Sequence, residues 1–315
     1  MSRARKITTL LATALASVIV LVGTVPCHAE DSAADLSPQA VAAQIEGVAP
    51  LEIVEVPVIV GDSAVAVVDG GTVTVPEDAA EPLQLEASDA TASDLTVSLP
   101  ELRAAEPSVL TDDGTIVYGS DEDVSLAVQV VDDGVRIQTV SNSADAPTEF
   151  SYEFGETVRP VIQPDGSAEL IEESRAGGAA IVGAVAVPWA VDANGERVAT
   201  EFRAEGNELV QVIEVLPTTE FPVVADPKVT TTWWNTTVYF NKAETRVFVA
   251  GTGAGSWLSK YFGLPGRVIS GVLGGYAAAA AIYLAAGKCL KLVQYMGSIP
   301  VPQPYSGNEA GGYCS

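Results

Sequence analysis

Residues 124–140 read VSLAVQVVDDGVRIQTV, and this stretch decides the fold class. Two runs rich in β-branched residues, Val124–Val131 and Val135–Val140, lie on either side of Asp133-Gly134. Asp-Gly favours the tight type I′ turn of a hairpin, because both central residues of that turn need a positive φ. The stretch therefore predicts two antiparallel strands joined by a short turn.

The same pattern recurs along residues 107–227. Four further turn signals lie at Asp113-Gly114, Asp165-Gly166, Asn194-Gly195 and Gly206-Asn207. Four further strand-like runs lie at Glu149–Phe154, Ile181–Val187, Val198–Ala204 and Leu209–Leu216. Short strands separated by regular turns predict a mainly antiparallel β-sandwich or small barrel.

Residues 30–106 are predicted to be an acidic lead and linker with short strands. Pro38–Glu46 is a candidate helix with Ser37 as N-cap, and a flexible lead is the alternative. Short strands are expected at Leu51–Val60, Ala64–Val68 and Thr72–Val75. Pro76–Asp94 is acidic and poor in large apolar residues, which predicts a solvated linker. Whether residues 51–106 form a separate sheet or join the later one stays open.

The first 29 residues predict a secretory signal peptide. Three basic residues precede an uncharged apolar run over residues 7–25, and the predicted cut falls between Ala29 and Glu30. An uncleaved anchor is the alternative, although the run is of borderline length for a membrane span. Cleavage removes His28, the only His, and so excludes catalysis or metal binding through His in the mature chain.

The charge of the chain changes sign at one point. Residues 30–227 hold six Arg, no Lys and 39 of the 41 acidic residues, a net charge of −33. Residues 228–315 hold seven basic and two acidic residues, a net charge of +5. This asymmetry predicts two regions with different partners, and it makes Asp226-Pro227 a candidate exposed linker that proteases can reach. Repulsion from phosphates argues against nucleic-acid binding by the acidic region.

Three strings within residues 105–227 carry a family resemblance. They are Ser143–Thr148 (SADAPT), Pro188–Gly195 (PWAVDANG) and Phe221–Pro227 (FPVVADP). The strings resemble a β module of secreted actinobacterial proteins that contains a PPWA.DANG stretch and ends in YPVVADP. The resemblance implies no activity. It implies a variable C-terminal region that begins after Pro227.

Residues 228–315 predict a small, cationic and mainly helical domain. Asn241 is a candidate helix N-cap with Glu244 three residues later. The run Val268–Gly287 has 20 uncharged residues, long enough to span a bilayer. Its possible membrane contacts are the small residues spaced four apart and the basic residue that follows: Gly271, Gly275, Ala279 and Lys288. Three interpretations stay open, namely a core helix of a secreted domain, a stop-transfer anchor, and a helix that inserts into target membranes.

Cys289 and Cys314 are the two cysteines of the predicted mature chain, and in an oxidising compartment we expect them to form a disulfide. A small cationic, Gly- and Ala-rich domain with one disulfide has a bacteriocin-like composition. Three stretches, Tyr239–Thr245, Gly287–Lys291 and Gly312–Cys314, are also similar to C-terminal domains of secreted actinobacterial proteins. Five aromatic residues suit either a membrane interface or a core: Trp233, Trp234, Trp257, Tyr261 and Tyr276.

We therefore expect a secreted, non-enzymatic α+β protein in which an acidic β domain (residues 107–227) carries a cationic helical domain (residues 228–315). The expected partners are an anionic membrane or cell-envelope surface, and the acidic and cationic domains are expected to contact each other. We predict no catalytic residue, cofactor or metal. The alternatives are a cell-envelope structural or adhesion protein, a form anchored through residues 268–287, and a hydrolase that uses carboxylates.

Overall fold

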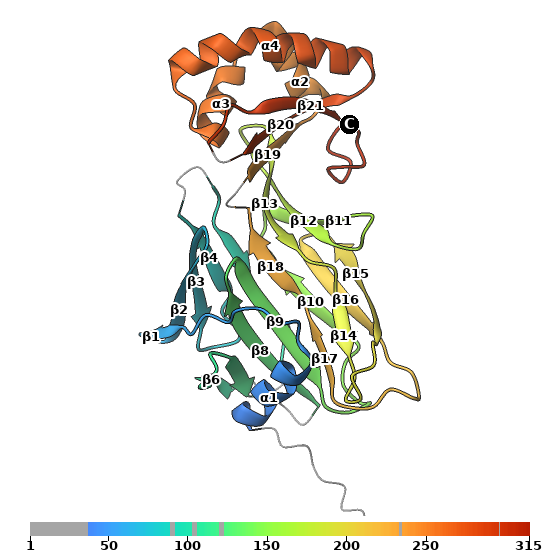
Figure 1. Ribbon diagram of the computed structural model, residues 1–315. Coiled ribbons are helices and arrows are strands. Elements are labelled where there is room, and N and C mark those ends of the chain that lie inside the picture. The colour runs from blue at the N-terminus through green and yellow to red at the C-terminus, as the bar shows by residue number, and fades with distance from the viewer. Residues whose placement is uncertain (1–36, 89–91, 103–105, 120–122, 233–234, 296) are drawn as a thin grey trace, which may run out of the picture. The chain divides into compact units, whose positions relative to one another are not determined.

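The computed structural model describes residues 37–315 except residues 89–91, 103–105, 120–122, 233–234 and 296. This part of the chain is a mainly antiparallel β-sheet protein with helices in its C-terminal region (Figure 1). The prediction of antiparallel β structure is confirmed. The predicted signal peptide and its cut between Ala29 and Glu30 lie outside the described residues.

The hairpin predicted from the opening stretch lies in the middle of the largest sheet. β8 (Val124–Val131) pairs with β9 (Gly134–Ser141), and Val131 faces Gly134 across the turn. The prediction that Asp133-Gly134 forms the centre of the turn is wrong: Asp132 and Asp133 lie between the strands, and Gly134 is the first residue of β9 and has no positive φ. Every residue of both strands is buried, because the core covers one face and residues 37–56 cover part of the other. This double burial also encloses polar side chains such as Gln129 and Gln138, which hydrogen-bond to each other at 2.8 Å.

The largest sheet has thirteen strands among the described residues. Its path runs β21-β20-β19-β13-β18-β9-β8-β7-β6, and β11, β12, β14 and β17 attach to it. The other strands of this sheet are β6 (Glu106–Leu110), β7 (Ile116–Gly119), β11 (Val158–Ile162), β12 (Ala168–Glu173), β13 (Ala179–Val185), β14 (Trp189–Val191), β17 (Val223–Asp226), β18 (Lys228–Thr231), β19 (Asn235–Phe240), β20 (Cys289–Tyr295) and β21 (Val301–Tyr305).

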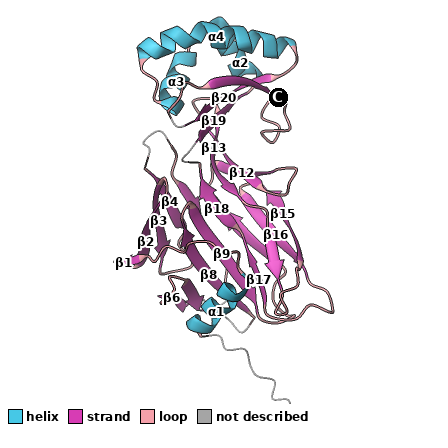
Figure 2. Ribbon diagram, in the orientation of Figure 1, coloured by secondary structure: helices cyan, strands magenta, loops and turns pink. Residues whose placement is uncertain are grey.

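Two smaller antiparallel sheets complete the β structure (Figure 2). The first contains β1 (Val58–Val60), β2 (Ser63–Val68), β3 (Gly71–Pro76), β4 (Leu83–Ala87) and β5 (Leu95–Val97). The second contains β10 (Glu149–Glu153), β15 (Ala199–Glu205) and β16 (Glu208–Glu214). The interpretation of Pro76–Asp94 as a linker is wrong: β4 lies within it, and Leu83 and Leu85 alternate into the core with 0% and 2% exposure.

Four helices are described: α1 (Pro38–Val48), α2 (Lys242–Ala250), α3 (Ala254–Phe262) and α4 (Gly266–Ala285). The predicted start of α1 is confirmed, since the Ser37 hydroxyl accepts a hydrogen bond from the Ala40 amide at 3.3 Å. The predicted capping box of α2 is also confirmed. There the Asn241 side chain accepts from the Glu244 amide, and the Glu244 carboxylate accepts from the Asn241 amide.

The step in net charge falls inside the large sheet. β17 and β18 lie on either side of Pro227, and both pair with β9. Asp226 is only 2% exposed, so the expectation that Asp226-Pro227 is an exposed linker is wrong. The cause is strand continuity, because β18 also pairs with β13 and so stays within the sheet. The division into domains at residues 106 and 227 stays a prediction.

The predicted disulfide between Cys289 and Cys314 is confirmed. Cys289 is the first residue of β20, and Cys314 directly precedes Ser315 at the end of the sequence. Both are buried in a small cluster with Tyr239 and Tyr305, which contact each other edge to face at 4.9 Å. The bridge therefore ties the last residues of the sequence to the sheet.

Candidate membrane-contact surface

The candidate site is the helix predicted from the long uncharged run. α4 begins at Gly266, directly after Pro265, whose fixed φ and missing amide hydrogen suit a helix start. The helix ends at Ala285, and Gly287 then takes a positive φ of 74° that lets the chain turn into β20. Figure 1 shows α4 as the outermost of the C-terminal helices, with α2 and α3 on its inner side.

The inner face of α4 holds its large side chains. Tyr276 and Ala280 are buried, and the other residues packed against the same cluster are Val268, Ile269, Val272, Leu273 and Tyr283. Two hydroxyls fix this face to β21 and the residue before it: Tyr276 donates to the Pro300 carbonyl at 2.6 Å, and Tyr283 donates to the Pro302 carbonyl at 3.1 Å.

The outer face of α4 is uncharged and exposed. Its residues recur every three or four positions: Ser270, Gly271, Gly274, Gly275, Ala278, Ala281, Ile282 and Ala285. Ile282 is the one large side chain among them and is 66% exposed. A Cβ placed on any of the three glycines would meet nothing within 4 Å. The most apolar stretch of α4 has a mean hydropathy of 1.7, and only 11% of that stretch is fully buried, so α4 is long and apolar enough to cross a membrane. Ten of its 20 residues are exposed.

The residues predicted as membrane contacts divide between the two faces. Gly271 and Gly275 are exposed on the outer face, and Lys288 is exposed just beyond the helix end. Ala279 is half-buried and turns inward. Sequence reasoning missed Ile282 and Arg267, although Arg267 is the basic residue directly before the uncharged run.

The basic residues near α4 are mostly without acidic partners. Within the described part of the chain, Lys242, Arg246, Arg267 and Lys288 form no ion pair. Arg267 lies in the first turn of α4 and Lys288 lies just past its last, so a positive charge remains at each end of the uncharged face. Lys288 also complements the negative end of the helix dipole.

Three of the five aromatic residues considered for a membrane interface pack against the C-terminal core. Trp257, Tyr261 and Tyr276 belong to the cluster beneath α4. For these three residues the structure therefore supports a place in the core and not at a membrane interface. The Trp257 ring lies 5.3 Å from that of Phe240 and 5.7 Å from that of Phe248. Burial raises the pKa of the Tyr276 hydroxyl to about 12, so it stays protonated and able to donate to Pro300. Trp233 and Trp234 lie outside the described residues.

Comparison with known proteins adds no family to these observations: no family model matches the chain, and no curated protein matches it. The resemblance to secreted actinobacterial proteins therefore stays a prediction. Among the described residues, no group of three or more His, Cys, Asp or Glu is placed to hold a metal ion.

Proposed function

We propose that this is a secreted, non-enzymatic protein whose acidic, sandwich-like β domain carries a small, cationic, disulfide-closed helical domain, and that the outer face of α4 rests on anionic membranes. The observation that carries the proposal is the exposure of α4, whose most apolar stretch is only 11% buried. An uncovered, uncharged surface of this kind usually marks an interaction site. Arg267 and Lys288 at its ends form no ion pair with the residues that the structure describes, and they favour a negatively charged surface as the partner.

The packing of α4 favours a helix that lies along the membrane over one that crosses it. A helix of 20 residues is about 30 Å long, which is enough to span the hydrocarbon layer. Crossing, however, would expose the buried Tyr276 and Ala280 and break the hydrogen bond from Tyr276 to Pro300. An interfacial position keeps these contacts and brings only the outer face against the lipid.

The chemistry of the outer face predicts weak binding that depends on charge. Gly and Ala offer little apolar area, and Ile282 supplies the largest single contribution. Each basic residue near an anionic surface contributes about 1 kcal/mol, an amount that salt reduces. We therefore expect binding to vesicles that contain anionic lipid, and a large loss of binding at high salt.

Vesicle sedimentation tests the proposal with the purified whole protein. The vesicles are phosphatidylcholine alone and phosphatidylcholine mixed with phosphatidylglycerol, each at low and high salt. We expect binding to the mixed vesicles at low salt, weakened about tenfold or more in Arg267→Gln/Lys288→Gln. Ile282→Glu should weaken it as well, because this variant brings a carboxylate to the lipid.

Two matched controls use exposed residues of the acidic region. Val67→Glu makes the same kind of change at a side chain that is 76% exposed on β2. Arg175→Gln/Arg197→Gln removes two exposed cations that form no ion pair in the described part of the chain. Both controls should bind like the unmodified protein. Absence of binding to the mixed vesicles, or equal losses in the controls and the α4 variants, would refute the proposal.

A second candidate function, a cell-envelope structural or adhesion protein, is favoured by the attachment of the C-terminal region. β18 pairs with both β9 and β13, and β19 pairs with β13, so this region is part of the main sheet. Limited proteolysis combined with vesicle leakage separates the two functions. Resistance of the whole chain without vesicle binding or leakage supports the envelope protein, and leakage supports membrane activity.

A further inference from the structure

Residues 37–56, which we call the N-terminal strap, cover part of the outer face of the large sheet. α1 packs on β7, β8 and β17. Its Val41 and Ile45 are 1% and 0% exposed and lie in a cluster with the outward-facing side chains of the sheet: Val117, Ala127, Val140 and Val224. Beyond α1 the strap stays on β8, since the Glu55 amide donates to the Val130 carbonyl at 2.9 Å.

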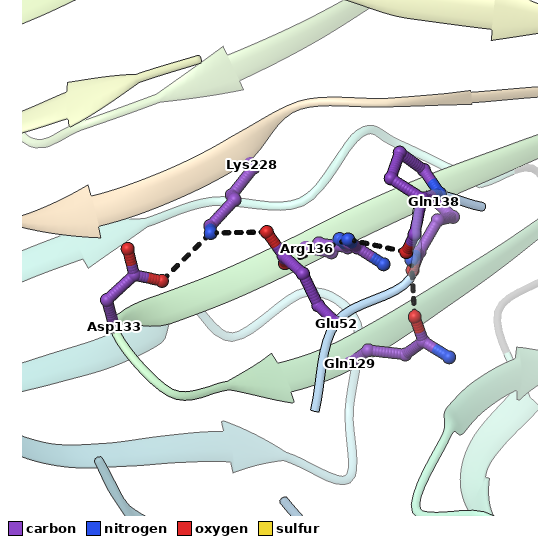
Figure 3. Close-up of polar contacts among 7 residues, drawn as sticks. Glu52, Gln129, Asp133, Arg136, Gln138 and Lys228 are labelled. Atoms are coloured by element: carbon purple, nitrogen blue, oxygen red, sulfur yellow. Dashed lines mark hydrogen bonds and ion pairs between the residues drawn. The ribbon is translucent and has the colours of Figure 1, made fainter. Parts of the chain in front are cut away.

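Two cations of the sheet hold one carboxylate of the strap (Figure 3). Arg136 of β9 is 3% exposed and donates from one terminal nitrogen to Glu52 Oε2 at 2.8 Å and to the Pro50 carbonyl at 2.9 Å. Lys228 Nζ lies 2.8 Å from Glu52 Oε1 and 2.9 Å from Asp133 Oδ1. Each oxygen of Glu52 is therefore taken by a different cation, which makes Glu52 the polar lock of the strap.

A third carboxylate, Asp226, precedes Lys228 by two residues and interacts with the groups of this lock. Asp226 of β17 is 2% exposed, and its Oδ2 atom has no hydrogen-bond partner among the described residues. The side chains that interact with it come from the neighbouring elements: Arg136 of β9, Lys228 of β18, Glu52 of the strap, Trp189 of β14 and Tyr152 of β10. α1 also packs against β17, but its one charged residue, Glu46, is exposed.

The charges of this cluster balance only when Asp226 is protonated. With all groups ionised, Glu52, Asp133 and Asp226 stand against two cations, which leaves one negative charge in excess, and of the three carboxylates only Asp226 is fully buried. Burial raises the pKa of Asp226 to about 7, although the charges of Arg136 and Lys228 and a hydrogen bond with Trp189 act to lower it. Tyr152 stays protonated over this range, because burial and the charge of Asp226 both raise its pKa.

We propose that the N-terminal strap is a pH-dependent clasp, closed while Asp226 is protonated and loosened when Asp226 ionises. Ionised Asp226 repels Glu52 and competes with it for Arg136, so the strap loses its polar lock. Opening the strap uncovers the apolar outer face around Val140 and Val224. This device concerns the opposite end of the described chain from α4, and it holds whether or not α4 binds membranes.

The direction of the pH effect follows from the shift at Asp226. In the closed state the pKa of this carboxyl is about 7, and the water that enters when the strap opens lowers it toward the ordinary value of 3.8. Closure is therefore most favourable at low pH and weakens as pH rises to 7. A full return to 3.8 would correspond to a loss of about thirtyfold in the closing equilibrium between about pH 5.5 and about pH 8.5, which is the upper limit of the effect.

Hydrogen-exchange mass spectrometry of the purified protein tests the clasp. Protection of peptides from residues 37–56, corrected for the intrinsic pH dependence of exchange, should fall between these two conditions, by up to about thirtyfold. Protection of peptides from β20 and β21 should stay constant and report that the fold is intact. In Asp226→Asn the strap should be equally protected in both conditions.

Two further variants separate the lock from general effects of charge. Glu52→Gln removes the carboxylate that both cations hold, so its strap should be less protected in both conditions. Glu46→Gln changes an exposed carboxylate of α1 and should behave like the unmodified protein. Equal strap protection in the unmodified protein at both pH values would overturn the proposal, as would an undiminished fall in Asp226→Asn. If Asp226→Asn does not fold, the decision rests on whether strap protection in the unmodified protein falls as pH rises toward 7 and levels off above it.

Discussion

At the scale of single residues, Glu244 joins three segments that are far apart in the sequence. Its Oε1 accepts from the Gly178 amide at 2.9 Å and from the Tyr313 hydroxyl at 3.0 Å. Its Oε2 accepts from the Asn241 amide at 2.9 Å and so completes the N-terminal cap of α2. One carboxylate thus connects the β12–β13 turn, the start of the C-terminal helices and the end of the sequence.

The change Glu244→Gln should therefore cost more stability than an ordinary surface change. It removes the charge from at least three hydrogen bonds, and we expect a loss of about 2 kcal/mol in the free energy of unfolding. Urea denaturation measures it. Glu201→Gln is the control, since Glu201 is exposed on β15, and it should change the free energy by less than about 0.5 kcal/mol. A similar small effect of Glu244→Gln would contradict its role as a connector.

At the scale of elements, the turn between β12 and β13 is the part of the sheet on which α3 docks. Trp257 donates to the Ala176 carbonyl at 2.8 Å, and Tyr261 donates to the Gly177 carbonyl at 2.8 Å. Gly177 has a φ of 98°, and a Cβ there would lie 2.8 Å from the Trp257 ring. The glycine is needed both for the backbone conformation and for the close approach of the indole.

These two requirements can be separated by comparing Gly177→Ala with Gly195→Ala. Gly195 also has a positive φ, 77°, but a Cβ there meets nothing within 4 Å. We expect Gly195→Ala to cost about 1 kcal/mol through backbone strain alone, and Gly177→Ala about 3 kcal/mol because the ring must also move. Thermal and urea denaturation of both variants provide the measurement. Equal losses would mean that the Trp257 ring moves aside at no cost in the free energy of unfolding.

The elements that the sequence predicted are those whose signals are local. The β8–β9 hairpin combines β-branched runs with a turn, and α2 carries its cap within four residues. β4 was missed because it is short and lies among acidic residues. The alternation of Leu83 and Leu85 with polar residues is its one local signal. In α4, the prediction that residues spaced four apart share one face was wrong for Ala279. Each step of four residues turns the helix by about 40° more than a full turn, so Ala279 lies away from Gly271 and toward the inner face.

At the scale of the whole molecule, the disulfide and the large sheet hold the C-terminal region together. The bond between Cys289 and Cys314 closes a separation of 25 residues. The segment that it fixes also contacts β11, where the Arg159 guanidinium donates to the Ala310 carbonyl at 2.9 Å. The end of the sequence is therefore attached to strands on both sides of the charge step.

Removing the disulfide should destabilise this attachment. From the length of the closed loop we expect Cys289→Ala/Cys314→Ala to lose about 3 kcal/mol in the free energy of unfolding. Guanidinium denaturation measures the loss, and reductant added to the unmodified protein should reproduce it. If reductant leaves the midpoint unchanged while mass spectrometry reports free thiols, the bond does not contribute to stability.

The long-range contacts of the molecule were beyond what the sequence could predict. Lys228 and Glu52 are separated by 176 positions, and no local pattern indicates that they meet. The burial of Asp226 was hidden for the same reason, since it depends on Trp189, Arg136 and the strap together. The length and lack of charge of α4 were predictable, because they are properties of one segment, whereas the sequence left open whether its outer face is covered.

The shared strand β9 has a practical consequence for protein engineering. β17 and β18 pair with adjoining parts of β9, although they belong to segments of opposite net charge. In a chimera whose second protein begins after Pro227, β18 would be replaced by a strand of that protein. Gly134–Arg136 of β9 would then pair with a strand that did not evolve with it. A chimera joined after Thr231 keeps this pairing, and with it Lys228, so that only the following segment is exchanged.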